Sequence, residues 1–302
     1  MDIIGKKYLY LVISFIVIIP GIVSLFLFGL NLSIDFAGGS RISLAISEGV
    51  SDTTVDTVRE VLNDKKIKTT TIERSEDHIF IRTEPLDQKL NAEFLSQLEQ
   101  KVENFKLESF ETIGPTIGRE TTENAVKAVI LASVLIVLYI SWSFRKVPKP
   151  ASGFRFGVCT IIALIHDVLV VVGVFSILGH FFGVEIDSLF FTAILTIIGF
   201  SVHDTIVVFD RIRENLRRMP GLPFDRVVND SILQTMVRSL NTSFTTILVL
   251  FSLLLLGGEN TRWFIVALLI GIVSGTYSSI FNASPLLVIW QEKFTKKSQK
   301  NS

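Results

Sequence analysis

This sequence of 302 residues has a single cysteine and no formal net charge. The one cysteine, Cys159, lies in an apolar run, so no intramolecular disulfide can form and we interpret it as an inert core residue. The 29 basic and 29 acidic residues cancel to a formal net charge of zero. The chain therefore has no global basic signature, and we predict that it binds no nucleic acid.

Motifs for cofactors, metals and nucleophilic catalysis are lacking as well. The sequence has no metal-ligand cluster, no phosphate-binding glycine loop and no nucleophile paired with a base. His78 stands alone in an expected turn at 75–78, where we interpret it as a solvated side chain rather than a ligand. We therefore expect a protein without cofactor or metal that is not an enzyme.

Apolar residues are abundant instead. They make up 49% of the chain and the mean hydropathy is +0.52, too high for an ordinary soluble domain of this length. A helix needs about 20 mainly apolar residues to cross a bilayer. Six stretches meet this requirement: 8–29, 124–144, 154–179, 187–210, 236–257 and 263–290. We predict six transmembrane helices, the first a retained anchor because its apolar run exceeds that of a signal peptide.

Basic residues predict the orientation of these helices, since they collect on the cytoplasmic side. They precede the first span, follow the sixth, and fill the loops at 145–155 and 211–226, whereas the loops at 180–187 and 257–262 have few. Both termini are therefore predicted to be cytoplasmic. We predict four parts: a cytoplasmic N-terminus with the first helix (1–30), an external domain (31–122), the remaining five helices (123–290) and a basic cytoplasmic tail (291–302).

The external segment predicts a small α+β domain. Strands are expected at 41–47, 67–73, 79–83 and 107–113, and helices from Asp52, interpreted as an N-cap, and over 87–105. The order βαββαβ is the ferredoxin-like, split-βαβ arrangement. About 80 residues suffice for one modest core. We interpret the domain as a binding or mechanical module.

Two charged residues interrupt adjacent spans. Asp204 lies in the fourth and Arg238 in the fifth. A charge at the centre of a spanning helix costs about 2.5–3.5 kcal/mol on insertion scales, so such residues usually face a cavity or a partner and mark ion paths. At the rise of a helix, both lie in the inner half of the bilayer and differ in depth by about 5 Å. That gap is within reach of an arginine side chain.

Further polar residues extend the pattern. The fifth span has a stripe at helical spacing that can order water, and the third span adds His166 and Asp167. The stripe consists of Thr235, Arg238, Asn241 or Thr242, and Thr245. We hypothesise that Asp204 carries a proton and Arg238 displaces it; the alternative is a static buried ion pair. Asp167 either joins this relay or bonds to a neighbouring helix.

Three motifs together resemble a known family. Residues 30–39 read LNLSIDFAGG, 199–215 read GFSVHDTIVVFDRIREN, and 238–246 read RSLNTSFTT. With six spans and one large first external segment, they closely resemble the SecF family, the smaller subunits of bacterial SecD–SecF pairs in the resistance-nodulation-division superfamily. In the first motif, Asp35, Gly38 and Gly39 favour a structural joint between helix and domain over a substrate contact.

The resemblance implies a function, partners and functional residues. Members pair with SecD in the inner membrane, beside the SecYEG channel and YajC, and are thought to use the proton gradient to pull unfolded preproteins outward. The family's membrane aspartate and arginine match Asp204 and Arg238. His203 stands where asparagine is common, which alters the hydrogen bonding beside Asp204, and Ser33 where glycine is common.

Two other functions stay open. One is a half-size, proton-coupled exporter of small molecules or lipids from the same superfamily, which the single compact external domain argues against. The other is a scaffold subunit that stabilises its partner and has no proton role. Under each of the three functions, we expect membrane lipid to surround the helices.

Overall fold

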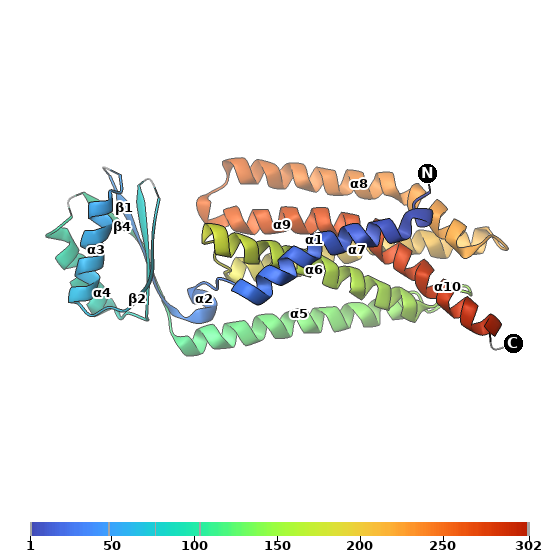
Figure 1. Ribbon diagram of the computed structural model, residues 1–302, viewed down its shortest axis with the longest axis horizontal. Helices are drawn as coiled ribbons and strands as arrows, with labels where there is room; N and C mark the ends of the chain where they lie inside the picture. The colour runs from blue at the N-terminus through green and yellow to red at the C-terminus, as the bar shows by residue number, and fades with distance from the viewer. Residues whose placement is uncertain (1, 48, 76, 103, 301–302) are drawn as a thin grey trace. The chain divides into compact units, whose positions relative to one another are not determined.

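The computed structural model describes residues 2–47, 49–75, 77–102 and 104–300, and it contains two compact units (Figure 1). One comprises Met1–Asn31 with Lys127–Ser302, and the other comprises Leu32–Val126. The first unit is helical and the second is α+β. Glu76 of the predicted turn and residues 301–302 of the predicted tail lie outside the described residues.

Six helices of the described residues are long and apolar enough to cross a membrane, which confirms the prediction. The first five are α1 (Lys7–Phe28), which follows the short 3₁₀ helix η1 (Ile4–Lys6), α5 (Pro115–Ser143), α6 (Gly153–Phe182), α7 (Ser188–Arg218) and α8 (Phe224–Leu256). The sixth consists of α9 (Glu259–Ser278), a five-residue π-helical stretch η2 (Ser279–Ala283) and α10 (Ser284–Lys300). Several helices continue past their predicted apolar limits, because good helix-forming polar residues extend them.

Small residues bring α1 and α6 into close contact. A Cβ atom placed on Gly21 would lie 2.8 Å from the Cα of Gly173, and the reverse distance is 2.7 Å. One turn further along, the hydroxyls of Ser24 and Ser176 are 2.9 Å apart, and Ser176 donates to the carbonyl of Gly29 at 2.7 Å. Small residues at such crossings let helix backbones approach, as is common in membranes.

Gly173→Ala is therefore expected to destabilise the helical unit by about 1–3 kcal/mol, because the added methyl has to push α1 away. Thermal unfolding of the purified chain in detergent measures the effect. The matched control is Gly199→Ala on α7, where a Cβ meets nothing within 4 Å. Equal melting temperatures for the two variants would contradict the close packing.

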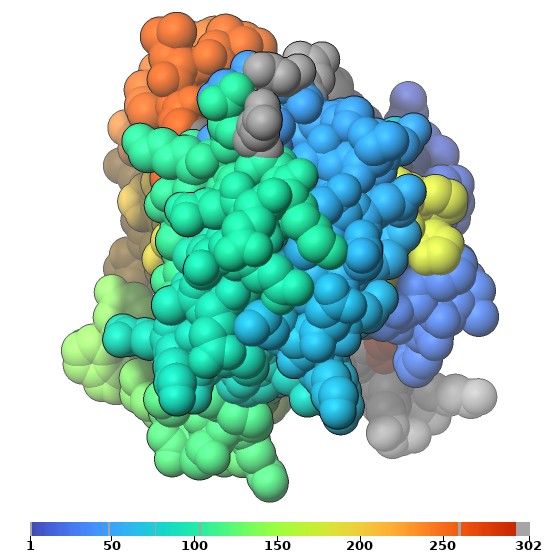
Figure 2. All heavy atoms as spheres, turned by 90° about the vertical axis from the view of Figure 1, so that its left-hand side faces the viewer, coloured from blue at the N-terminus to red at the C-terminus, as the bar shows by residue number. Residues whose placement is uncertain are grey.

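The α+β unit has the predicted βαββαβ order. Its strands β1 (Gly39–Ile46), β2 (Thr69–Arg74), β3 (His78–Thr83) and β4 (Phe105–Ile113) form an antiparallel sheet in the order β2-β3-β1-β4. Helices α3 (Asp52–Asp64) and α4 (Gln88–Glu99) lie side by side on one face of this unit (Figure 2). Between helices and sheet lies a core that includes Ile42, Leu44, Val58, Ile79, Ile81, Phe94 and Leu98.

Two local predictions in this unit are wrong. The N-cap of α3 is Ser51, whose hydroxyl accepts from the amide of Thr54 at 3.1 Å, and Asp52 is the first helical residue. Serine and aspartate are equally good caps, so their order alone does not decide between them. The second helix ends at Glu99 rather than at 105, and β4 begins earlier, at Phe105.

His78 is also placed differently from the prediction. It opens β3, its side chain is 22% exposed, and its two ring nitrogens lie 2.6 Å from a carboxylate oxygen of Asp77 and 3.2 Å from one of Glu108. The hydrogen bond with Asp77, and then that with Glu108, raise the pKa of His78 above its ordinary value of 6.5. The contact with Glu108 links β3 to a strand that is far away in the sequence, so the local pattern could not reveal it.

The raised pKa gives the α+β unit a pH-dependent contribution to stability. Protonated His78 stabilises the folded unit fully below the ordinary pKa, and the contribution is lost as the pH rises through the folded value. We expect NMR titration of the full chain, which has four histidines, to give His78 a pKa above 6.5. Glu108→Gln should lower it, whereas Glu111→Gln, the same change three residues along β4, should leave it unaltered. A pKa that ignores both changes would refute this contact.

Candidate functional site in the membrane helices

Asp204 of α7 is half-buried beside a small cavity. Its oxygen Oδ2 lies 3.4 Å from the hydroxyl of Ser243 on α8, and that hydroxyl accepts from Thr276 of α9 at 2.6 Å. The cavity holds about 10 Å³, near the least that admits one water molecule. Its walls come from α7, α8 and α9: Phe200, Ser201, His203, Asp204, Thr242, Ser243, Ile272, Gly275 and Thr276.

The hydrogen bond of Ser243 has two possible acceptors. Its hydroxyl lies 3.0 Å from the carbonyl of Ser239 and 3.4 Å from Asp204, and one proton can serve one of them at a time. The contact with Asp204 is at the long end for a hydrogen bond. Among the described residues, no other side chain hydrogen-bonds to Asp204. The carboxyl therefore keeps acceptor positions open toward the cavity.

Arg238 does not pair with Asp204. The ion pairs of the described residues include none between them, and the Arg238 side chain is exposed. The face of α8 that packs inward carries Ser231, Thr235, Ser239 and Ser243, each four residues after the last. Arg238 precedes Ser239 by one residue, which turns it about 100° away around the helix.

The predicted polar stripe on α8 is thus only partly brought to the site. Thr235 is buried and Thr242 lines the cavity, whereas Asn241 and Thr245 are exposed with Arg238. Thr242 donates to the carbonyl of Arg238 at 2.8 Å, so its hydroxyl is used within its own helix. Ser239 and Ser243, which share the buried face with Thr235, were missed because serine occurs in apolar helices without breaking their pattern.

His203 lies next to Asp204, is exposed, and lines the same cavity. The sequence predicts its proximity from adjacency alone, and the structure brings both residues to one cavity.

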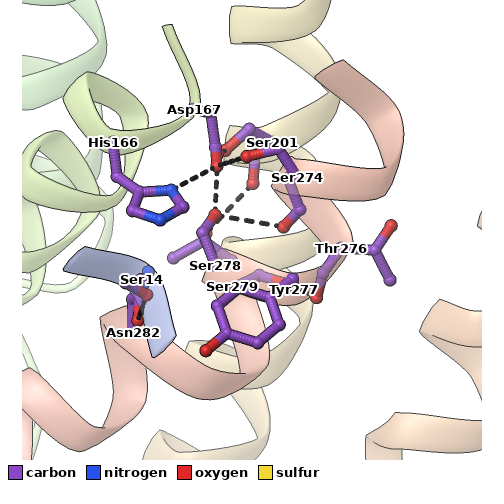
Figure 3. A network of polar contacts seen from close by, with 12 residues as sticks. Ser14, His166, Asp167, Ser201, Ser274, Thr276, Tyr277, Ser278, Ser279 and Asn282 are labelled. Atoms are coloured by element: carbon purple, nitrogen blue, oxygen red, sulfur yellow. Dashed lines mark hydrogen bonds and ion pairs between the residues drawn. The ribbon is translucent and has the colours of Figure 1, made fainter. Parts of the chain in front are cut away.

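Asp167 of α6 is enclosed by hydroxyl groups (Figure 3). Its oxygen Oδ2 accepts from Ser201 of α7 at 2.6 Å and from Ser278 of α9 at 2.7 Å, and Oδ1 accepts from Ser274 of α9 at 2.7 Å. The ring nitrogen Nδ1 of His166 lies 3.0 Å from Oδ1. Asp167 is 1% exposed. Of the two predicted roles for Asp167, bonding to neighbouring helices is the one that these contacts display.

The polar interior continues on the other side of this network. Ser14 of α1 donates to Asn282 of η2 at 2.8 Å (Figure 3). Tyr277 of α9 donates to the carbonyl of Tyr10 at 2.8 Å. The Nε2 atom of His166 is buried and has no hydrogen-bond partner among the described residues. The π-helical stretch lies at this level of the sixth span, and such bulges frequently occur at functional sites.

The glycines of the first motif lie where backbones nearly touch. Gly38 has φ +73° and Gly39 has φ +126°. A Cβ atom on Gly38 would lie 2.9 Å from the Cα of Pro115, and one on Gly39 would lie 2.6 Å from the carbonyl oxygen of Thr83. Asp35 belongs to the short helix α2 (Ile34–Ala37), whose N-cap Ser33 accepts from the Asp35 amide at 3.2 Å. This close approach favours the structural joint over a substrate contact.

Comparisons with known proteins agree with these features. The family model "Protein export membrane protein SecD/SecF, C-terminal" matches residues 93–293, and "SecD/SecF GG Motif" matches residues 23–50. A protein translocase subunit SecF of Thermobaculum terrenum is 47% identical, over 97% of this chain and 95% of its own. The chain belongs to the SecF family. A SecF of Anaerolinea thermophila is 41% identical over 96% of this chain and 94% of its own.

A solved structure extends the likeness to three dimensions. The crystal structure of SecDF from Thermus thermophilus superposes with a TM-score of 0.83 and 35% identity, covering 97% of this chain and 39% of that one. The SecDF sequence from the same organism is 37% identical over 91% of this chain and 36% of its own length. The match confirms the predicted multi-pass helical fold with one α+β domain. In that relative, the part that resembles this chain belongs to one longer SecDF chain.

Proposed function

We propose that this chain is a SecF-type subunit of the Sec protein-export machinery, which works with a SecD-type partner and uses the proton-motive force in late steps of preprotein translocation. The observation that carries the proposal is similarity over nearly the whole chain to proteins named protein translocase subunit SecF. It favours protein export over both a half-size small-molecule or lipid exporter and a scaffold subunit.

The partners follow from the same relatives and from the family. SecDF of Thermus thermophilus joins a SecF-like part to the rest of one chain, which supports a SecD-type partner for this separate chain. The family resemblance adds the SecYEG channel, YajC and the unfolded preprotein. We place the protein in the inner membrane with both termini in the cytoplasm, since basic residues flank the spans on that side.

Asp204 is the proposed proton carrier. The neutral carboxyl suits a helix inside the membrane, and the ionised form gains the hydroxyl of Ser243 when that group turns from the Ser239 carbonyl. The cavity beside it offers room for one water molecule to deliver or remove the proton. His203 lies in the wall of that cavity and is a secondary member of the relay.

Arg238 is proposed to displace the proton. Its guanidinium stays charged, so its approach to Asp204 favours the ionised carboxylate. The two side chains are apart in the present arrangement, and the cycle therefore includes a movement of α8 or of the Arg238 side chain. One charge that crosses 100 mV releases about 2.3 kcal/mol, enough to shift a two-state equilibrium by more than tenfold.

Two assays on the same membranes test the proposal. Inverted vesicles that contain the chain and its SecD-type partner are expected to take up more preprotein when a proton gradient is imposed, and to conduct protons while they do so. Vesicles that lack the chain are the control. Proton flux without an effect on preprotein would indicate a small-molecule exporter, and neither effect would indicate a scaffold.

A further inference from the structure

The two buried acids of the helical unit have contrasting surroundings. Oδ2 of Asp167 accepts two hydrogen bonds, and Oδ1 accepts one and lies 3.0 Å from Nδ1 of His166, so both oxygens are occupied by polar neighbours. Asp204 has one long contact, with Ser243, and a cavity beside it. Asp167 is thus suited to hold its neighbours in place, and Asp204 is suited to exchange a proton.

Ser201 belongs to both surroundings. It donates to Asp167 at 2.6 Å, is 3% exposed, and also lines the Asp204 cavity. It precedes Asp204 by three residues on α7, so the two share one helical face. Any rotation of α7 that moves Ser201 away from Asp167 also moves Asp204 relative to Ser243. The bond to Asp167 and the cavity of Asp204 thus meet at one residue of α7.

The backbone of α9 closes the same contact from the other side. A Cβ atom on Gly275 would lie 3.2 Å from the Cβ of Ser201 and 3.6 Å from Oδ2 of Asp167. The next residue, Thr276, donates to Ser243, the hydrogen-bond partner of Asp204. α7 and α9 thus meet tightly at the level of Ser201, and the Asp204 cavity lies directly beside this contact.

Few groups around Asp204 can carry a charge. On α7, His203 is next to Asp204 and lines the cavity. On α6, Asp167 is bonded to Ser201 of the cavity wall, and His166 contacts Asp167. The residues of α8 and α9 that line the cavity are uncharged: Thr242, Ser243, Ile272, Gly275 and Thr276. Arg238 of α8 is exposed. The orientation of α7 therefore controls which of these groups Asp204 faces.

We propose that Asp167 is a positioning residue for Asp204, which acts through the hydroxyl of Ser201; this rests on the proposed role of Asp204 as the proton carrier. Asp167 holds α7 in the rotation at which Asp204 faces Ser243 and the cavity. Its bonds to Ser274 and Ser278 tie α6 to α9 and do not involve α7.

Two matched serine variants separate an effect on Asp204 from mere attachment between helices. Ser201→Ala and Ser274→Ala each remove one hydroxyl that donates to Asp167, at 2.6 and 2.7 Å, and both serines are buried. The full chain is assembled with its SecD-type partner in inverted vesicles, and gradient-driven preprotein uptake is measured against pH. Thermal unfolding of each purified complex is measured in parallel.

The expected result differs between the two variants in pH dependence and not in stability. Ser201→Ala should move the midpoint of the pH profile by about half a pH unit or more, whereas Ser274→Ala should leave it in place. Both should lower the melting temperature to a similar extent. If Ser201→Ala does not assemble, Ser201→Cys, which keeps the size and weakens the donor, is judged by the same criterion.

Equal pH profiles for the two serine variants would overturn the proposal and leave Asp167 as an attachment between helices. Asp204→Asn in the same vesicles keeps this outcome distinct from failure of the proposed function. If that variant loses gradient-driven uptake while the serine variants behave alike, positioning alone is refuted. If it behaves like the wild type, the proton role of Asp204 is refuted and positioning with it.

Discussion

Asp204→Asn is expected to abolish the effect of a proton gradient on preprotein uptake, with at least a tenfold loss of the gradient-driven rate. Asparagine has nearly the shape of the acid and stays neutral, so the cavity and the contact with Ser243 are retained. It cannot exchange a proton, so the energy of about 2.3 kcal/mol per charge and 100 mV is no longer coupled to movement. The rate is measured in inverted vesicles with and without an imposed gradient.

Asp210→Asn is the matched control for this experiment. Asp210 lies six residues further along α7, is exposed, and forms an ion pair with Arg213 one turn away. The chemical change is the same, and it lies outside the cavity. Exposed pairs of this kind contribute little to stability. Wild-type stimulation by the gradient in Asp204→Asn, or an equal loss in both variants, would rule out a special role for Asp204.

Gly39→Ala is expected to destabilise the α+β unit by about 2–4 kcal/mol. The added Cβ would lie 2.6 Å from the carbonyl oxygen of Thr83, and the φ of +126° is one that alanine rarely adopts. Neither the strain nor the overlap is relieved easily, because Gly39 begins the central strand β1 and Thr83 ends its neighbour β3.

Hydrogen exchange of the full-length chain measures this effect, since the amides of β1 and β3 should lose protection in the variant. Gly114→Ala is the control: Gly114 has no positive φ, and a Cβ there meets nothing within 4 Å. Full protection of β1 and β3 in Gly39→Ala would show that the joint tolerates a side chain. The glycine pair would then need another explanation, such as contact with the preprotein.

The sequence predicts the fold largely because each element depends on its own residues. Six apolar runs of membrane length become six spans, and the alternation at 41–47 becomes β1. The motif around Asp204 likewise identifies an acid of the fourth span that lies against a cavity. Local errors occur where two residues satisfy the same rule, as at Ser51 and Asp52.

The site is less predictable, since it depends on which faces of the helices meet. Counting along the helices gives Asp204 and Arg238 similar depths, but depth says nothing of rotation, and Arg238 turns away from α7. The three serines around Asp167 come from two other helices, α7 and α9, and carry no sequence signal of their own. The contact between His78 and Glu108 likewise joins two distant segments across the sheet and has no local sequence signal.

By itself, the sequence determined how many times the chain can cross a membrane, the βαββαβ order, and the presence of an acid in the fourth span. These follow from hydropathy and periodicity, which act over neighbouring residues. Only the tertiary structure decided that Ser243 rather than Arg238 meets Asp204, and that Ser201, which lines the same cavity, bonds to Asp167. The reason is that helix rotation and close glycine contacts arise from packing between distant segments, which no local pattern encodes.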